Sequence, residues 1–152
     1  MAEGEARGDG LELTDRPDEG DLATITAGLA AYNRTFIGPR EARPLLVTVR
    51  RDGRIAGGLS AETVRGVLEI DLLWVDEACR GQGLGSRMLR AAEAEAARRG
   101  CRAVTVGTFD FQARPFYERE GYTVAGEVGG YPDGHRWFML TKALTSEPAR
   151  AT

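Results

Sequence analysis

Apolar and polar residues alternate with a period of two through the middle of this chain, which predicts a set of strands. The segments are LLVTVRR, RIAGGLSAETV and VLEIDLLWV, and together they cover residues 45–75. Asp52-Gly53 and Arg65-Gly66 separate them and are typical of tight turns. The three segments therefore predict an antiparallel meander.

A period near 3.6 residues marks two helices, at residues 18–34 and 84–99. The apolar positions of the first recur at Leu22, Ile25, Leu29 and Tyr32. Those of the second recur at Leu84, Met88, Leu89, Ala92 and Ala96. Gly100 follows the second helix and predicts its C-terminal cap.

The remaining elements complete an α/β order. The patterns predict a short strand at 11–14, a strand at 101–109, a short helix at 112–120, and strands at 122–128 and 135–144. The strand–helix–strand unit over 67–108 should form a parallel right-handed crossover. We expect one layered α/β domain over residues 11–144, with disordered tails at 1–10 and 145–152.

Composition excludes several classes of protein. The 152 residues suit one domain, and 42% apolar with 28% charged residues are ordinary for a globular protein. A net charge of −3 without a basic cluster speaks against a nucleic-acid partner, and no apolar run is long enough to span a membrane. The polar N-terminus and the two cysteines, without a CxxC pair, favour a cytoplasmic protein.

The strand at 67–75 carries two carboxylates on one face. If the strand is regular, Leu68, Ile70, Leu72 and Trp74 point to the core. Glu69 and Asp71 then lie on the opposite face, about 7 Å apart by the rise of a strand. They could take a proton from an amine, bind a cationic substrate, or be solvated, and a bulge would change the direction of either.

The stretch CRGQGLGSRML, at residues 79–89, places three glycines at the start of a helix. The first amides of a helix lack partners and the helix dipole is positive there, so a bare backbone at this place favours a small anion, above all a phosphate. Arg80, Gln82 and Ser86 could add side-chain donors. The absence of a lysine excludes a P-loop, and the spacing of the glycines does not fit the dinucleotide fingerprint.

The segment LLWVDEACRGQGLGSRML resembles motif A of the GCN5-related N-acetyltransferases, the GNAT family, whose pattern is [RQ]-x-x-G-x-[GA]. Arg80, Gly83 and Gly85 fill this pattern, and FYEREGY resembles a second signature further along the chain. The resemblance extends over residues 11–144. It implies a mixed sheet of six to seven strands with helices on both faces and a splayed central strand pair.

The resemblance also implies an acyl-coenzyme A, most simply acetyl-CoA, as the co-substrate. Its pyrophosphate would lie on the amides of residues 81–86, and its pantetheine arm would pair with the backbone of Leu73, Trp74 and Val75. The implied cofactor residues also include Arg80, Gly81, Gln82, Gly83, Leu84, Gly85, Ser86 and Phe116. Asp110 stands where the family often has an asparagine that contacts the cofactor, so it could face the substrate instead.

Tyr117 is the implied proton donor to the leaving thiolate, and the alternative is a half-buried core tyrosine. Ala113, Phe116 and Tyr117 share a helix face, and a phenol with an ordinary pKa near 10 suits that role. The acceptor would contact Tyr32, Asn33 and Phe36 in the first helix and its following loop, together with His135, the single histidine. One histidine and two distant cysteines supply no ligand set for a metal.

The sequence therefore predicts an N-acetyltransferase that acts on a primary amine of a small molecule, by direct attack in a ternary complex. Two alternatives remain open: an enzyme that acetylates proteins or peptides, and a non-catalytic module that binds acyl-CoA. Transfer to oxygen is also open. A homodimer is common among proteins of this kind.

Overall fold

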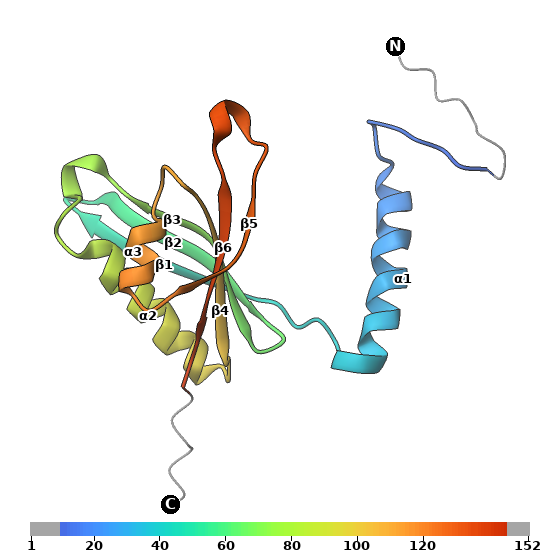
Figure 1. The fold of residues 1–152 in the computed structure, drawn as a ribbon. Coiled ribbons are helices and arrows are strands. Elements are labelled where there is room, and N and C mark those ends of the chain that lie inside the picture. Colours follow the sequence, from blue (N-terminus) through green and yellow to red (C-terminus); the bar gives the residue numbers. More distant parts are fainter. Residues whose placement is uncertain (1–9, 146–152) are drawn as a thin grey trace, which may run out of the picture. The chain divides into compact units, whose positions relative to one another are not determined.

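The structure, a computed structural model, describes residues 10–145 and divides the chain into two units, Met1–Arg40 and Glu41–Thr152 (Figure 1). The first unit holds helix α1, and the second holds six strands with helices α2 and α3. The tails expected at 1–10 and 145–152 lie outside the described residues, apart from Gly10 and Thr145. The strand expected at 11–14 is wrong, because these residues join no strand of the sheet.

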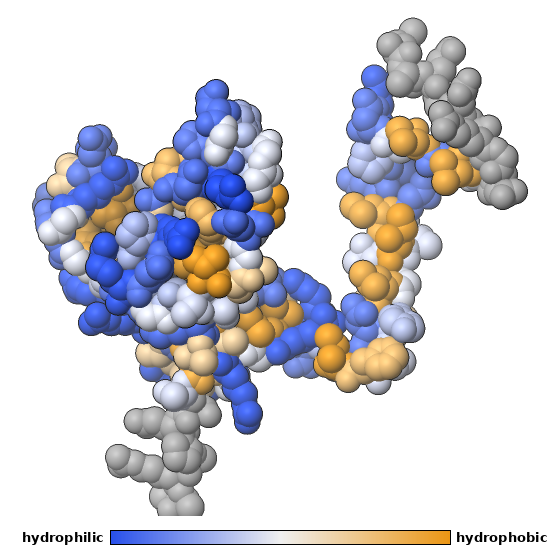
Figure 2. Space-filling view, in the orientation of Figure 1, coloured by the Kyte–Doolittle hydropathy of each residue, from blue (hydrophilic) through white to orange (hydrophobic). Residues whose placement is uncertain are grey.

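Helix α1 spans Glu19–Ile37 and begins at the side chain of Asp18, which accepts hydrogen bonds from the amides of Gly20 and Asp21 at 3.0 and 3.1 Å. No residue of α1 is buried. Its exposed apolar side chains recur at helical spacing, at Leu22, Ile25, Leu29, Tyr32 and Phe36 (Figure 2). Such a stripe is typical of a helix that packs against another surface.

The second unit is built on one mixed sheet of six strands in the order β1-β2-β3-β4-β6-β5. The strands are β1 (Arg43–Arg51), β2 (Arg54–Val64), β3 (Val67–Val75), β4 (Ala103–Phe109), β5 (Thr123–Val128) and β6 (Trp137–Ala143). Short 3-10 turns follow β3 and β5, at Glu77–Cys79 and Pro132–Gly134. The predicted meander is confirmed, and so is the mixed α/β sheet that the family resemblance implies.

The only parallel pair in the sheet, β3 with β4, is short. Val67–Ile70 pair with Ala103–Val106, and beyond these four positions the two strands no longer pair with each other. β4 instead continues along β6 as far as Phe109, and β3 continues along β2 as far as Val75. The predicted splay of the central strands is therefore confirmed, and it opens toward their carboxyl ends.

A bulge in β3 corrects the predicted facing of this strand. Ser60 pairs with Leu72 and Ala61 pairs with Ile70, so Asp71 is an extra residue in the ladder. The extra residue reverses the alternation, and Leu72 and Trp74 become 63% and 51% exposed. Leu68 and Ile70 do face the core as predicted, but beyond the bulge Leu73 and Val75 pack against it.

Helix α2, Leu84–Arg98, covers β1, β2 and β3 and closes the core (Figure 1). Its buried apolar residues are those of the predicted stripe: Leu84, Met88, Leu89, Ala92 and Ala96. Burial of a leucine or methionine side chain stabilises the fold by about 1.5–3 kcal/mol. The short helix α3, Arg114–Arg119, adds Tyr117 to the same core, so α2 and α3 cover one face of the sheet. A helix on the other face stays a prediction.

No helix in the described part of the chain is long and apolar enough to cross a membrane.

Gly107 in β4 lies under the indole ring of Trp137 in β6, at the point where β4 leaves β3. A Cβ at Gly107 would lie 2.2 Å from Cζ2 of Trp137. We expect Gly107→Ala to displace this ring and to lower the free energy of unfolding by about 2–3 kcal/mol, measured by denaturant titration. Gly126→Ala in β5, where nothing lies within 4 Å, is the control and should change it by less than about 0.5 kcal/mol. Equal effects of the two variants would contradict the packing role of Gly107.

Candidate active site

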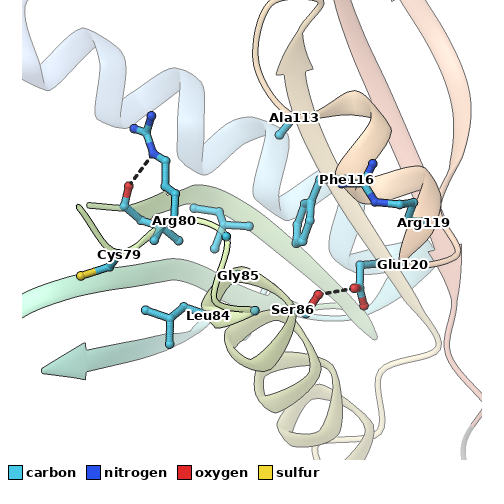
Figure 3. Close-up of a pocket in the computed structure, with 13 residues that line it drawn as sticks. Cys79, Arg80, Leu84, Gly85, Ser86, Ala113, Phe116, Arg119 and Glu120 are labelled. Atoms are coloured by element: carbon cyan, nitrogen blue, oxygen red, sulfur yellow. Dashed lines mark hydrogen bonds between the residues drawn. The ribbon is translucent and has the colours of Figure 1, made fainter. Parts of the chain in front are cut away.

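A cavity of about 590 Å³ lies where β3, the start of α2 and α3 meet (Figure 3). Leu73 and Val75 form the strand side, beyond the last pair that β3 makes with β4. The lining is completed by Cys79, Arg80, Gly81, Gly83, Leu84, Gly85, Ser86, Ala113, Phe116, Arg119 and Glu120. The cavity therefore occupies the carboxyl end of a splayed strand pair, the usual place of a ligand in open α/β sheets.

The glycine-rich loop presents its backbone to this cavity. Gly81 and Gly83 both have φ of 75°, a left-handed conformation that side chains rarely adopt, and Gly83 is the N-cap of α2. The first hydrogen bond of the helix ladder joins the amide of Arg87 to the carbonyl of Gly83 at 3.1 Å. The amides of residues 84–86 thus have no acceptor within the helix, and a small anion would satisfy them.

Arg80 holds the loop to the end of β3. Its Nε donates to the carbonyl of Val75 at 3.1 Å (Figure 3). Val75 is the last residue of β3 and lies beyond the last pair of β3 with β4. Arg80, a predicted cofactor residue, lines the cavity, while its Nε is engaged by the end of β3.

Ser86 lines the cavity, but its hydroxyl group donates to Glu120, which lies after α3 (Figure 3). The other carboxylate oxygen of Glu120 accepts from Nε of Arg90 at 3.3 Å. The hydrogen bond from Ser86 lowers the pKa of Glu120, the charges of Arg90 and Lys142 lower it further, and burial acts against them. The backbone amide of Ser86 is therefore available to a ligand in the cavity, whereas its hydroxyl proton is already donated to Glu120.

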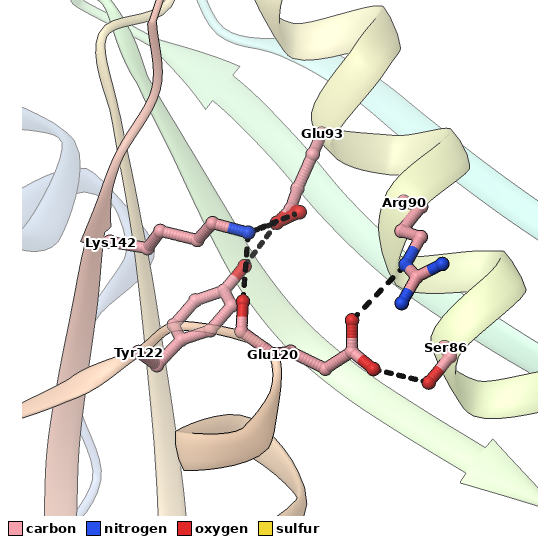
Figure 4. A network of polar contacts seen from close by, with 6 residues as sticks. All are labelled: Ser86, Arg90, Glu93, Glu120, Tyr122 and Lys142. Atoms are coloured by element: carbon pink, nitrogen blue, oxygen red, sulfur yellow. Dashed lines mark hydrogen bonds and ion pairs between the residues drawn. The ribbon is translucent and has the colours of Figure 1, made fainter.

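A buried polar network anchors the segment after α3 to α2 (Figure 4). Glu93, 8% exposed, accepts from Nζ of Lys142 at 2.9 Å and from the hydroxyl of Tyr122 at 3.1 Å. Lys142 also donates to the carbonyl of Glu120 at 2.8 Å. Burial, and then the negative charge of Glu93, raise the pKa of Tyr122. The network fixes the end of α3 and thereby one wall of the cavity.

Tyr117 lies next to the cavity without lining it. Its side chain is 3% exposed and packs between Phe116 and Tyr122, with ring centroids 5.1 and 5.5 Å away. Burial raises the pKa of Tyr117 to about 12, so the phenol keeps its proton at neutral pH. Phe116, its neighbour, does line the cavity as predicted.

Three predicted cofactor residues do not line the cavity. Trp74 points to the other face of the sheet because of the bulge, and Gln82 accepts a hydrogen bond from Arg51. Asp110 accepts from Nδ1 of His135 at 2.8 Å and from the amide of Arg136 at 3.1 Å. Burial acts to raise the pKa of Asp110, but these hydrogen bonds outweigh it and lower the pKa.

The predicted catalytic carboxylates lie in a second hollow. Glu69 and Asp71 line a space of about 540 Å³ with Pro44, Ser60, Ala61, Glu62 and Ile70. Tyr32, Asn33 and Phe36 lie on α1 in the other unit, where the rings of Tyr32 and Phe36 are 5.2 Å apart. The contact of these three residues with an acceptor stays a prediction.

The structure adds four residues to the cavity that the sequence did not identify as site residues, Cys79, Ala113, Arg119 and Glu120. Ala113 belongs to the helix face named from the sequence. Glu120 and Arg119 could not be recognised, since Glu120 meets Ser86 across 34 positions of the chain. Among the described residues no group of three or more His, Cys, Asp or Glu could hold a metal ion.

Comparison with known proteins agrees with this geometry. Residues 13–122 match the model of the acetyltransferase (GNAT) family. The chain belongs to the GNAT family. It is 44% identical to the blasticidin-S acetyltransferase of Streptomyces morookaense over 121 residues. This match covers 76% of this chain and 88% of that protein.

Two further GNAT relatives extend the match. An acetyltransferase of Agrobacterium fabrum is 38% identical over 131 residues, 86% of this chain and 96% of that protein. The crystal structure of an acetyltransferase from Bacillus cereus is 30% identical with a TM-score of 0.80, over 87% of this chain and 97% of that one. The protein is therefore an acyl-CoA-dependent acetyltransferase with the GNAT fold.

Gly85, in the first turn of α2, lies close to the ring of Phe116 in α3. A Cβ there would lie 3.3 Å from Cζ of Phe116. We expect Gly85→Val to push a branched side chain between this ring and the amides of the helix start, and to weaken the binding of coenzyme A by about tenfold or more in calorimetry.

Ala94→Val is the matched control, because residue 94 is exposed on the same helix. It should leave the affinity for coenzyme A unchanged. Wild-type affinity in a folded Gly85→Val protein would show that the ligand does not approach this backbone.

Proposed function

We propose that this GNAT protein transfers the acetyl group of acetyl-CoA to a primary amine of a small molecule, by direct attack in a ternary complex. The observation that carries the proposal is the cavity at the start of α2, which is open to the unpaired side of β3 at Leu73 and Val75. A diphosphate fits the free amides of residues 84–86. A pantetheine arm fits the unpaired edge of β3, which offers the hydrogen bonds of a missing strand.

The relatives support a small amine as the acceptor. One relative is named for blasticidin-S, and a second, from Bacillus subtilis, is 32% identical over 112 residues and is named as a phosphinothricin acetyltransferase. Both names give a small molecule as the compound that is acetylated. We propose an acceptor of this class, a small polar compound with a free primary amine, with blasticidin-S as the first compound to test.

The proposed reaction needs a neutral amine, a place for the acetyl group and a proton for the leaving thiolate. Acetyl-CoA supplies the activated acetyl group. Tyr117 holds a proton on a phenol that burial keeps neutral, and it lies on the helix that lines the cavity through Phe116. We propose that this phenol gives its proton to the sulfur atom as the bond from carbon to sulfur breaks.

Glu69 and Asp71 are the proposed partners of the acceptor amine. Glu69 and Asp71 of β3 line the second hollow together with Glu62 of the paired strand β2. Carboxylates suit an ammonium group both as ion partners and as proton acceptors. His135, whose Nδ1 faces the carboxylate of Asp110, is proposed as a further contact of the acceptor.

Release of free thiol from acetyl-CoA tests the proposal directly. We expect turnover with blasticidin-S or another small amine in a panel of aminoglycosides, polyamines, amino acids and short peptides. Release that occurs only with peptides would favour a protein or peptide acetyltransferase. Binding of coenzyme A without release for any amine would favour a module that binds but does not catalyse.

Tyr117→Phe tests the proton donor. We expect kcat to fall by about tenfold or more, while the affinity for coenzyme A in calorimetry stays within about twofold. The variant keeps the buried ring and removes only the hydroxyl group, so folding should be retained. Unchanged kcat with a good acceptor would assign Tyr117 to packing alone.

A further inference from the structure

Arg119 ends α3 and lines the cavity on the side away from Arg80 (Figure 3). Its side chain is exposed. Arg80 and Arg119 are the two cationic side chains in the lining, and Arg80 donates to the carbonyl of Val75. Arg119 has no hydrogen bond or ion pair to any other part of the chain that the structure describes.

This lack of a partner is notable because Arg119 stands between two glutamates. Glu118 pairs with Nε of Arg114 at 2.8 Å, one turn back in the same helix. Glu120 is held by Ser86 and by Arg90 of α2 (Figure 4). Both neighbouring carboxylates are therefore engaged elsewhere, and the charge of Arg119 is left for an anion in the cavity.

The nearby cations are also engaged. Arg90 pairs with Glu120 at 3.3 Å, and Arg51 donates to Gln82 in the glycine-rich loop. Arg119 is thus the cation of the cavity wall that a ligand can recruit without breaking a contact of the protein. A guanidinium group can donate two parallel hydrogen bonds to a phosphate.

Coenzyme A carries two separate phosphate groups, a diphosphate in its chain and a monophosphate on the 3′-hydroxyl of its ribose. The amides of residues 84–86 suit the diphosphate, and they leave the monophosphate without a partner. Residues of β3, the glycine-rich loop and α3 line the same cavity, so a ligand with its pantetheine arm at β3 and its diphosphate at the loop shares that cavity with Arg119.

On the basis of the proposed function, we propose that Arg119 binds the 3′-phosphate of the coenzyme and makes the enzyme select coenzyme A over 3′-dephospho-coenzyme A. The selection is a property of binding and adds no step to the transfer of the acetyl group. Arg119 is then a specificity residue of the coenzyme site.

Calorimetry with these two ligands on wild-type protein and on Arg119→Gln tests the proposal. We expect wild-type protein to bind coenzyme A about tenfold more tightly than the dephospho form. In Arg119→Gln the ratio should fall to within about twofold, through weaker binding of coenzyme A alone. Arg119→Lys should recover part of the preference, because it restores the charge without the planar pair of donors.

Arg102→Gln is the matched control, since it removes the same charge from an exposed residue beyond the C-terminal end of α2. It should leave the ratio unchanged. A wild-type protein that binds both ligands equally, or an Arg119→Gln protein that binds both equally less well than wild type, would overturn this inference while the proposed function stands. A folded wild-type protein that binds neither ligand would overturn the proposed function, and this inference with it.

Discussion

The early separation of β3 from β4 is the constraint on which the rest of the site depends. The two strands share four paired positions and then follow different neighbours. A strand edge that faces a gap has amides and carbonyls without partners, which is costly when they are buried. Arg80 satisfies one of them through the carbonyl of Val75, and the cavity beside Leu73 and Val75 leaves room for a ligand to satisfy others.

The separation is held open by packing on both sides. On one side the bulge at Asp71 interrupts the regular ladder between β2 and β3, and it turns Leu73 and Val75 toward the core. On the other side Trp137 lies over Gly107, so β4 and β6 stay together as β4 leaves β3.

The elements of the sheet could be predicted from the sequence because their signals are local. The turn at Asp52-Gly53 separates β1 from β2, the turn at Arg65-Gly66 separates β2 from β3, and Gly83 fixes the start of α2. The facing of Leu72 and Trp74 could not be predicted. One extra residue in a ladder does not disturb the alternation of apolar and polar residues in the sequence, but it exchanges the faces of the sheet to which the following side chains point.

The same limit applies to the site. The glycine-rich loop and Phe116 were found because a short motif carries them. The hydroxyl of Ser86 was expected to face an anion, but it donates to Glu120. This contact and the pair of Glu118 with Arg114 engage the two carboxylates next to Arg119, so the charge of Arg119 is free. The contact between Ser86 and Glu120 joins α2 to the segment after α3, and no pattern within either segment contains it.

The anchoring of α3 links the two ends of the proposed coenzyme site. Tyr117 points inward from α3 and Arg119, two residues later, lies at the cavity wall, so one helix would hold both the proton donor and the contact with the 3′-phosphate. Lys142 binds the carbonyl of Glu120, and Tyr122 and Lys142 share the carboxylate of Glu93. Glu93, Tyr122 and Lys142 are not among the residues that line the cavity, so they hold α3 in position without lining the ligand's space. Polar contacts between α2, β6 and the segment after α3 therefore hold α3 in place, and with it the two groups that are proposed to meet the coenzyme.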